Sequence, residues 1–436
     1  MKKIPSKKTF IKSNKQMSGS HNKNHSSHQK LDWFKKNKIK IKIAVLVFVT
    51  FFATIAVSLW IFLDIPLISP IDSLTTFMFL SKSQLAKNNE KIIYGFLPYW
   101  NVNIFTLQKE LTHLSYFSLT LNADGSFASS IDGELEMGLH RLNSDEFSEI
   151  SEDSLDKNKK TEIVVSQFNH DDIVYFLNSE TAQANFLQSI DNVLLAYPFS
   201  GINIDIETSG KTDEKMQQNL TDFIVKLRKH LDEKYNHVQL SIDMYAGAAT
   251  NQQLWQVSEI APYVDYIVVM AYDFHRSSSS NAGPVAPLFG GKEFWDGDIN
   301  GYLQAFLKVV PTEKILLGIP FYGYEWQTTS RESQSHTFPD TGSTASYTRV
   351  IEILERKDEL QVQEHWNEDA LSPYISYIED GEIYVIYYED SRSISYKLDY
   401  VNQLDLGGIA IWALGYEGDS RELWDVIERK VNIVKN

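Results

Sequence analysis

The sequence predicts an α/β fold, a (β/α)8 (TIM) barrel with an α+β insertion, preceded by one transmembrane helix. Three observations support this prediction. From Lys91 onward, short β-branched or aromatic runs alternate with stretches of helical periodicity, as in repeated strand–helix units around a parallel sheet. Eight such runs fit into about 345 residues, which is enough for a closed barrel with insertions. A single long apolar run lies ahead of them.

The composition is that of a globular protein, with 43 % apolar and 22 % charged residues in a chain of 436 and no cysteine. The lack of cysteine excludes a thiol nucleophile, a cysteine zinc site, an iron–sulfur cluster and disulfides. Residues 1–42 hold 13 of the 41 Lys and Arg and only one of the 57 acids, so this tail carries +12 and the remainder −28. A body this acidic is a poor polyanion binder, and we expect no nucleic-acid partner.

Residues 43–63 are predicted to be an uncleaved transmembrane signal anchor. These twenty-one residues contain no charge, Pro or Gly, and as a helix they span about 31 Å, the thickness of a bilayer core. A buried core helix and a cleavable signal peptide are the alternatives. The apolar region of a signal peptide is usually shorter and ends in a small-x-small site, whereas Asp64-Ile65-Pro66-Leu67 follows here.

The lysines before the apolar run predict the orientation, since positive charge stays in the cytoplasm. Residues 1–42 are expected to form a basic, disordered cytoplasmic tail, because they contain few apolar groups. Residues 64–90 are interpreted as a stalk and residues 91–436 as the barrel. The predicted location is therefore the cell membrane, in a single pass, with the barrel outside the cytoplasm.

The eight predicted barrel strands are separated by credible helices and by one large insertion. The strands are Ile92–Tyr99, Leu114–Leu121, Glu162–Phe168, Gly201–Glu207, Gln239–Tyr245, Tyr266–Asp273, Ile315–Tyr322 and Gly408–Leu414. Residues 325–389 form the insertion between the seventh and eighth strands, and Asp380-Gly381 within it predicts a hairpin turn.

One of the helices is predicted from its cap and its apolar face. Thr212 is taken as the cap, and acidic residues occupy the first turn. The residues expected on the buried face are Met216, Leu220, Phe223, Ile224, Leu227 and Leu231.

The chemistry is concentrated in the fourth predicted strand, whose sequence is Gly-Ile-Asn-Ile-Asp-Ile-Glu over residues 201–207. Side chains on a strand alternate faces, so Asn203, Asp205 and Glu207 point to one side and the isoleucines to the other. The carboxylates fall at the C-terminal end of the strand, where barrel enzymes place their chemistry. The alternatives are a buried polar network that only fixes packing and an ordinary edge strand.

This strand resembles the signature of glycoside hydrolase family 18, Asp-Gly-x-Asp-x-Asp-x-Glu on the fourth strand of a (β/α)8 barrel. The resemblance extends over nearly all of residues 91–430. In detail, the sequence is most similar to the bacterial branch that includes spore-coat and cortex-lytic N-acetylglucosaminidases. Further matching segments are Gly95-Phe96-Leu97-Pro98-Tyr99-Trp100, Met270-Ala271-Tyr272-Asp273, Gly318-Ile319-Pro320-Phe321-Tyr322-Gly323-Tyr324-Glu325-Trp326, Tyr388-Glu389-Asp390-Ser391-Arg392-Ser393 and Gly407-Gly408-Ile409-Ala410-Ile411-Trp412-Ala413-Leu414-Gly415.

The resemblance implies a substrate-assisted, retaining mechanism in which the N-acetyl group of the sugar is the nucleophile. Glu207 would protonate the glycosidic oxygen and later activate water. Asp205 would hold the acetamide N–H and stabilise the cyclic intermediate, and Tyr272 would donate to the acetamide oxygen. Trp412 would stack under the sugar.

Further positions are carried over as substrate-binding residues. They are Asn203, Met270, Asp273, Tyr99, Trp100 and Tyr322, and the aromatic members among them are plausible sugar platforms. Core packing is the alternative for each aromatic residue, since 13 % of the chain is aromatic. Asp243 also lies near a strand end, but it matches no motif of the family and is left aside.

Two departures from the family pattern indicate an active enzyme whose catalytic carboxyl groups have altered surroundings. Ser200 and Asn203 stand where the first and second Asp of the signature are usual, so part of the carboxylate relay is neutral. Ser166-Gln167-Phe168-Asn169 replaces the usual Ser-x-Gly-Gly on the third strand. Asp205 and Glu207 are intact.

We therefore expect a glycosidase that acts on a β-linked N-acetylglucosamine polymer, with peptidoglycan favoured over chitin, and that needs no metal or cofactor. The alternative from another class is a weak or inert, lectin-like surface protein of the same fold. The intact Glu207 argues against it. Phosphate-loop, dinucleotide-binding, GxSxG and HExxH motifs are absent from the sequence.

Overall fold

The computed structural model describes residues 91–251 and 253–432. The predicted tail (1–42), membrane anchor (43–63) and stalk (64–90) lie outside these residues. None of the helices between residues 91 and 432 combines the length and the apolar character that crossing a bilayer requires.

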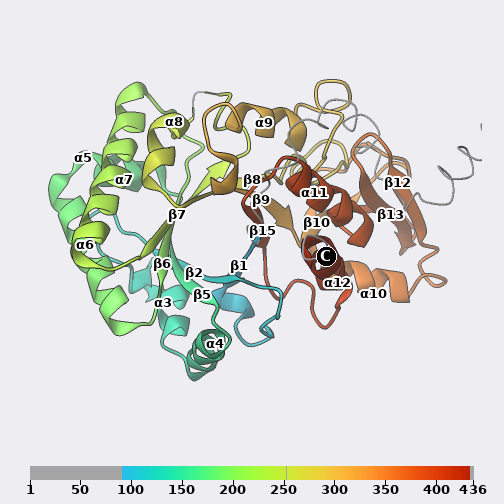
Figure 1. Cartoon of the computed structure of the whole chain (residues 1–436). Coiled ribbons are helices and arrows are strands. Elements are labelled where there is room, and N and C mark those ends of the chain that lie inside the picture. Colours follow the sequence, from blue (N-terminus) through green and yellow to red (C-terminus); the bar gives the residue numbers. More distant parts are fainter. Residues whose placement is uncertain (1–90, 252, 433–436) are drawn as a thin grey trace, which may run out of the picture. The chain divides into compact units, whose positions relative to one another are not determined.

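Eight parallel strands close into a barrel, as predicted, in the order β1–β15–β9–β8–β7–β6–β5–β2 (Figure 1). Each predicted barrel run overlaps one of them. Their bounds are β1 Ile92–Pro98, β2 His113–Thr120, β5 Lys160–Gln167, β6 Gly201–Ile206, β7 Gln239–Tyr245, β8 Tyr266–Met270, β9 Ile315–Pro320 and β15 Gly408–Trp412.

β8 and β9 are among the barrel strands that are shorter than predicted, and both end where the chain turns toward the site. β8 stops at Met270, and Asp273 has φ 62°, a left-handed conformation that ends any strand. β9 stops at Pro320 because the next strand, β10 (Tyr322–Gln327), joins the sheet of the insertion instead. The insertion sheet therefore begins at Tyr322, three residues before the predicted boundary.

Helices cover the outside of the barrel, and their bounds are α3 Met137–Leu142, α4 Asp145–Asp156, α5 His170–Asn178, α6 Glu180–Ala196, α7 Glu214–Lys234, α8 Val257–Ile260, α9 Ile299–Phe306, α11 Ser391–Gln403 and α12 Glu422–Asn432. The predicted buried face of α7 is confirmed at all six positions. Its cap is Asp213 rather than Thr212, since the Asp213 carboxylate accepts from the Met216 N–H at 2.8 Å.

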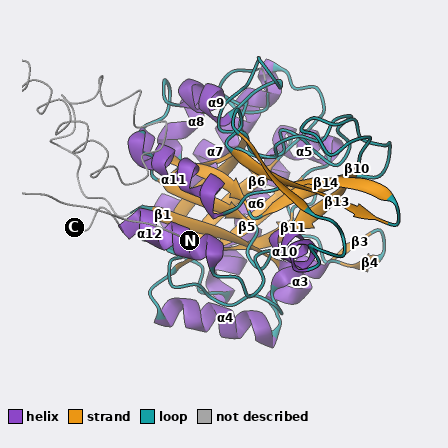
Figure 2. Ribbon diagram, turned by 90° about the vertical axis from the view of Figure 1, so that its right-hand side faces the viewer, coloured by secondary structure: helices purple, strands orange, loops and turns teal. Residues whose placement is uncertain are grey.

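The insertion forms a five-stranded antiparallel sheet in the order β11–β10–β14–β13–β12, with α10 (Tyr347–Glu355) beside it (Figure 2). Its other strands are β11 Ser343–Ser346, β12 Gln363–Asn367, β13 Ser372–Glu379 and β14 Glu382–Tyr387. The predicted hairpin is confirmed. Asp380 and Gly381 have φ 53° and 85°, as a two-residue turn between β13 and β14 requires.

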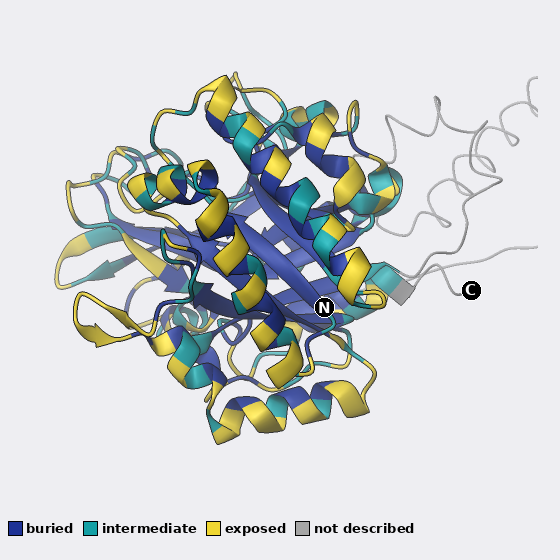
Figure 3. Cartoon of the chain, turned by 90° about the vertical axis from the view of Figure 1, so that its left-hand side faces the viewer, coloured by how far each residue is buried: buried dark blue, intermediate teal, exposed yellow. Residues whose placement is uncertain are grey.

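Burial follows this architecture: the barrel strands are buried along their length, while the surrounding helices alternate buried and exposed faces (Figure 3). One apolar cluster fills the barrel and includes Tyr94, Phe96 and Val164. A second cluster, centred on Trp326, lies under the insertion sheet and reaches Tyr272. The site described below lies where these clusters meet, because Trp412 packs against both.

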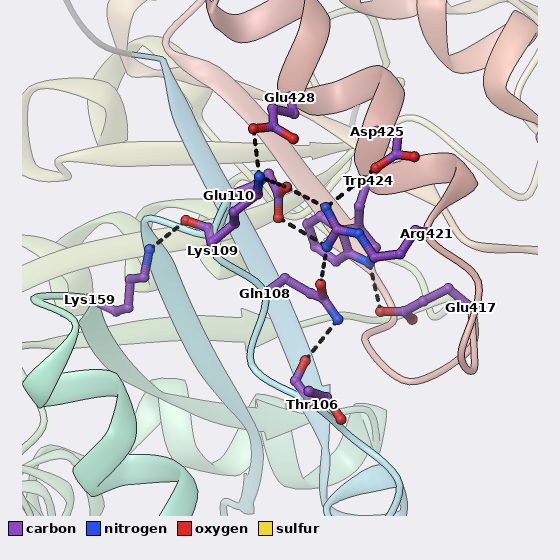
Figure 4. A network of polar contacts seen from close by, with 10 residues as sticks. All are labelled: Thr106, Gln108, Lys109, Glu110, Lys159, Glu417, Arg421, Trp424, Asp425 and Glu428. Atoms are coloured by element: carbon purple, nitrogen blue, oxygen red, sulfur yellow. Dashed lines mark hydrogen bonds and ion pairs between the residues drawn. The ribbon is translucent and has the colours of Figure 1, made fainter.

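A network of charged side chains joins the loop after β1 to the start of α12 (Figure 4). Arg421 Nη2 lies 2.6 Å from Glu110 Oε1, and Lys109 Nζ lies 2.6 Å from Glu428 Oε1. We call these residues, together with Asp425, the seam. The seam fastens the last described helix to the loop between β1 and β2.

Candidate active site

The alternation predicted for β6 is present in the structure. Asn203 reaches across to β7, while Asp205 lines a cavity at the strand's C-terminal end. Ile202, Ile204 and Ile206 are at most 1 % exposed and do not line this cavity. Glu207 follows the strand directly and is tied to β5 by a hydrogen bond from its N–H to the Gln167 carbonyl.

The cavity has a volume of about 360 Å³ and lies at the C-terminal ends of the barrel strands. Eight of the ten predicted site residues line it. The full lining is Trp100, Phe117, Phe168, Asp205, Glu207, Asp243, Tyr245, Met270, Tyr272, Asp273, Arg276, Tyr322 and Trp412.

Asp205 and Glu207 form a hydrogen-bonded pair of carboxyl groups. Burial raises the pKa of Glu207, while hydrogen bonds from Tyr245 and Asp205 oppose that rise. The pKa of Asp205 is also raised, first by burial and then by the charges of Glu207 and Asp243. Like charges this close cannot both ionise without cost, so the pair holds a proton near neutral pH. A carboxyl group that keeps its proton at neutral pH is suited to general acid catalysis.

Tyr272 stands over the pair and presents a neutral hydroxyl. Burial and the neighbouring carboxylates Asp243 and Glu207 raise its pKa well above the usual value, so it remains a donor. Gly318 on β9 makes room for this ring, since a Cβ there would lie 2.9 Å from Tyr272 Cε1 and 2.6 Å from a backbone oxygen.

Aromatic rings form one wall of the cavity. The Trp412 ring packs edge-on against Phe117, with centroids 4.7 Å apart, and against Trp100 at 6.4 Å. Trp100 is 46 % exposed, so much of its surface faces solvent at the cavity mouth. An indole wall of this kind suits the apolar face of a sugar ring.

Asp273 is held in place rather than free to move. Tyr324 donates to its Oδ1 at 2.9 Å, and Tyr322 donates to the same oxygen. Arg276 Nε lies 3.6 Å from Oδ2. Tyr322, predicted as a sugar platform, therefore also uses its hydroxyl to position Asp273.

Two predicted site residues do not line the cavity. Asn203 is fully buried below it, and its amide donates to Ser241 Oγ and Asp243 Oδ1. Tyr99 packs edge-on against Trp100 in the 3-10 turn Tyr99–Asn101 and supports that ring from behind. Ser200 lies at the other end of β6, where its hydroxyl bonds the backbone of Thr161, so its exchange for the usual Asp does not touch the cavity.

The sequence interpretation missed five lining residues: Phe117, Phe168, Arg276 and the polar pair Asp243 and Tyr245. The last two come from β7, where Ser241, Asp243 and Tyr245 alternate with apolar residues as the polar side chains of β6 do. Because β6 and β7 are parallel and adjacent, their inward positions fall at matching levels. That pairing is the signal that would have found these two.

A second cavity of about 790 Å³ shares Tyr245, Met270, Tyr272, Asp273 and Arg276 with the first, so the two lie next to each other. Its remaining walls carry amides and aromatic rings from the loops after β7, β8 and β10, among them Gln253, Asn281, Trp295 and Gln334. Within residues 91–251 and 253–432, no group of three or more His, Cys, Asp or Glu side chains is placed to hold a metal ion.

Comparison with known proteins places this geometry in a family context. The model of glycosyl hydrolases family 18 matches residues 77–417. Over 259 residues the chain is 27 % identical to the putative sporulation-specific glycosylase YdhD of Bacillus subtilis, covering 58 % of this chain and 56 % of that protein. The chain thus spans little more than half of that relative.

Solved structures share the fold. The Group IV chitinase of Ostrinia furnacalis, determined in complex with allosamidin, matches 79 % of this chain and 98 % of its own, with a TM-score of 0.67 and 23 % identity. The spore cortex-lytic enzyme SleL of Bacillus megaterium matches 79 % of this chain and 75 % of its own, with a TM-score of 0.61 and 19 % identity.

Proposed function

Because the chain belongs to glycosyl hydrolases family 18, we propose that it hydrolyses β-glycosidic bonds in polymers that contain N-acetylglucosamine. The observation that carries this proposal is the buried Asp205–Glu207 pair, placed in one cavity with Tyr272 and Trp412. The pair supplies a proton donor at neutral pH, and the indole wall supplies a surface for a sugar ring.

The first step is cleavage of the glycosidic bond. Glu207 gives its proton to the glycosidic oxygen as the bond to C1 breaks, and the acetamide oxygen of the same sugar forms a bond to C1. The leaving sugar departs as an alcohol, and the cyclised sugar carries a positive charge. Water then adds to C1, loses a proton to Glu207 and reopens the ring, so configuration is retained.

Asp205 and Tyr272 act on the acetamide group in this scheme. Asp205 accepts the acetamide N–H, and its negative charge stabilises the cyclic cation as its hydrogen bond to Glu207 gives way. Tyr272 donates to the acetamide oxygen and so aims it at C1. Trp412 holds the sugar ring by stacking.

The same strand offers no further carboxylate as a nucleophile, but β7 and the loop after β8 place two in the cavity, Asp243 and Asp273. Each is engaged: Asp243 accepts from the Asn203 amide, and Asp273 accepts from two tyrosine hydroxyls. The acetamide therefore remains the favoured nucleophile.

Chemically defined oligosaccharides test this mechanism. Removing the acetyl group from the sugar on the non-reducing side of the cleaved bond should abolish hydrolysis, whereas removing it from the leaving sugar should be tolerated. A thiazoline mimic of the cyclised sugar should inhibit strongly. A stable adduct on any of the four cavity carboxylates after treatment with a fluorinated sugar, seen by mass spectrometry of the intact protein, would overturn substrate assistance.

Peptidoglycan is our proposed polymer. Its sugars carry lactyl and peptide substituents that need space beside the reacting ring, and the 790 Å³ cavity adjacent to the catalytic one provides room. Arg276 lines both cavities and can pair with a carboxylate of a peptide substituent. The similarity to a putative sporulation-specific glycosylase supports the same choice.

Parallel digestion of purified peptidoglycan and of chitin oligomers distinguishes a peptidoglycan hydrolase, a chitinase and a lectin-like protein. The products are identified by mass spectrometry. Faster release of muramic-acid-containing fragments supports peptidoglycan, and exclusive cleavage of the oligomers identifies a chitinase. Binding to either polymer with no product would mean a lectin-like protein.

We also propose that residues 43–63 anchor the barrel on the outer side of a cell membrane. The support is the length of the uncharged run and the lysines before it. The protein should stay with washed membranes, with the barrel open to added protease and the N-terminal tail protected. A soluble mature form that begins near Pro66 would contradict this.

A further inference from the structure

Three carboxyl groups from two neighbouring strands share the buried end of the catalytic cavity. They are Asp205 and Glu207 of the β6 segment and Asp243 of β7. The register pairs Asn203 with Ser241 and Ile204 with Ile242, so the next level sets Asp205 beside Asp243. Asp205 and Asp243 are each only 3 % exposed.

The Asn203 amide is fitted to Asp243. Its two N–H groups point to Ser241 Oγ at 3.0 Å and to Asp243 Oδ1 at 2.8 Å. An ionised carboxylate in place of Asn203 would face Asp243 Oδ1 at that distance, oxygen against oxygen, which is unfavourable in a buried site. Residues 203 and 243 therefore hold one amide and one carboxylate as a matched pair.

Three adjacent carboxyl groups cannot all be ionised, and the hydrogen bonds indicate which of them hold the proton. Asp243 accepts from a neutral amide, which favours its ionised form. Asp205 Oδ1 has no hydrogen-bond partner among the described residues, and the Asp205 carboxyl is bonded to Glu207. The charge is thus best placed on Asp243 and the proton on the Asp205–Glu207 pair.

We propose that Asp243 is a positioning residue whose buried negative charge, held by the Asn203 amide, keeps the proton on the Asp205–Glu207 pair. In this chain Asp243 takes over, from the neighbouring strand, the place of the acid that family members usually carry at position 203. The proposal rests on the glycosidase function proposed above and concerns how its acid is kept protonated.

The groups that face Asp243 from the surrounding strands are consistent with this role. Tyr94 of β1 and Tyr272 after β8 stay neutral, because burial, with Asp243 among the nearby charges, raises the pKa of each. Glu162 of β5 reaches the same network through Ser241, and burial raises its pKa to about 7. Burial raises the pKa of Asp243 well above its usual value too; the Asn203 amide opposes this rise, and the charges of Glu207 and Glu162 add to it.

The cationic side of the cavity lies farther out. Arg276 lowers the pKa of Glu207 and forms its own ion pair with Asp273. Tyr245, the remaining titratable neighbour on β7, donates to Glu207. Asp243 is therefore the buried charge whose effect on the pair is opposite in sign to that of Arg276.

The test is the pH profile of hydrolysis by Asp243→Asn. A negative neighbour raises the pKa of an acid, so its removal lets the Asp205–Glu207 pair lose its proton at lower pH. We expect the alkaline limb of kcat/KM to move down by roughly one pH unit, a tenfold loss of proton affinity. At pH 8, kcat should fall more than KM changes, because the sugar contacts remain.

A double variant that exchanges the amide and the carboxylate tests whether the charge of Asp243, rather than its shape, affects the pair. Asn203→Asp combined with Asp243→Asn returns one carboxylate to β6 and should bring the alkaline limb back toward the wild-type position. Asp191→Asn is the matched control, since it removes another buried carboxylate, held on α6 by His230 and Tyr235. It should lower stability and leave the profile unmoved.

A direct titration keeps the test independent of the substrate. Carbon-13 spectra of the side-chain carboxyl groups should show the pair titrating at lower pH in Asp243→Asn than in the wild type. This measurement needs no substrate, so a wild-type protein that cleaves no polymer tried would count against the proposed function alone. The role of Asp243 would be overturned if Asp243→Asn shifted neither the titration nor the alkaline limb. It would also be overturned if the alkaline limb of the double variant were displaced as far as that of Asp243→Asn.

Discussion

Two polar networks of this protein differ in the groups that contact their carboxylates. In the barrel interior, Glu162 accepts from Tyr94 at 2.7 Å and Ser241 at 2.8 Å, and the chain of contacts continues through Asn203 to Asp243. These partners are hydroxyl and amide groups. At the seam, by contrast, the acids face Lys109 or Arg421 (Figure 4).

The contrast follows from what each network does. A carboxylate beside a cation keeps a low pKa and is ionised at neutral pH, which suits a seam that only fastens elements together. A carboxyl group buried among neutral donors has a raised pKa and keeps a proton, at a cost in stability when it must ionise. The interior is thus arranged for proton transfer and the seam for attachment.

The largest effect is expected from Glu207→Gln, which keeps the shape of the acid but removes its proton. Turnover of N-acetylglucosamine oligomers should fall by about 10²-fold or more, since general acid catalysis contributes on that scale. Oligosaccharide affinity, measured by calorimetry, should persist because the aromatic wall is unchanged. A Gln variant as active as the wild type would remove Glu207 from the mechanism.

The next effect concerns stability and its pH dependence. Burial raises the pKa of Glu162 to about 7 from its usual 4.5, so the native protein holds a proton that the unfolded chain releases between these values. Stability should therefore fall as pH rises through this window and level off above it. We therefore compare the free energy of unfolding of Glu162→Gln with that of the wild type at two pH values. The difference, variant minus wild type, should be roughly 2–3 kcal/mol larger at pH 8 than at pH 5.

Urea unfolding at the two pH values measures this difference. Asp191→Asn serves as the control: burial raises the pKa of Asp191, but hydrogen bonds from Lys234 and His230 outweigh it and hold the pKa below the usual value. Its contribution is lost only in acid, so it should not change between pH 5 and 8. Equal pH dependence in wild type and Glu162→Gln would mean that the interior carboxyl is not protonated at neutral pH.

Patterns local to one segment predicted most of the fold. The alternation in β6 placed Asp205 and Glu207 correctly at the cavity, and Asp380-Gly381 located the hairpin, because both signals lie within a few consecutive residues. The cap of α7 was misplaced by one residue, since Thr212 and Asp213 both suit a cap and only the Asp213 contact to the backbone decides.

Relations between strands were harder to predict. Asp243 follows Asn203 by forty residues, and its partnership with that amide depends on β6 and β7 being neighbours in register. The assignment of Tyr322 to the insertion sheet likewise depends on its pairing with Ser346 of β11. Motif matching examines one segment at a time, so it left Asp243 aside.

The smallest effect is expected at the seam. Arg421 is 41 % exposed, whereas the Glu110 side chain that it contacts is 5 % exposed. Arg421→Ala leaves that carboxylate with Lys109, whose Nζ is 3.8 Å away. Because the partner is partly exposed and solvent screens the pair, the free energy of unfolding should fall by about 1 kcal/mol.

The same variant separates the two networks. Arg421→Ala should leave kcat and the alkaline limb of the pH profile unchanged, because the seam shares no residue with the cavity. Lys357→Ala, which breaks an ion pair with Glu364 in which both side chains are 54 % exposed, is the control and should not measurably change stability. Lost turnover in Arg421→Ala at full stability would show that the seam positions the catalytic strands, and attachment and proton transfer would then not be separable in this barrel.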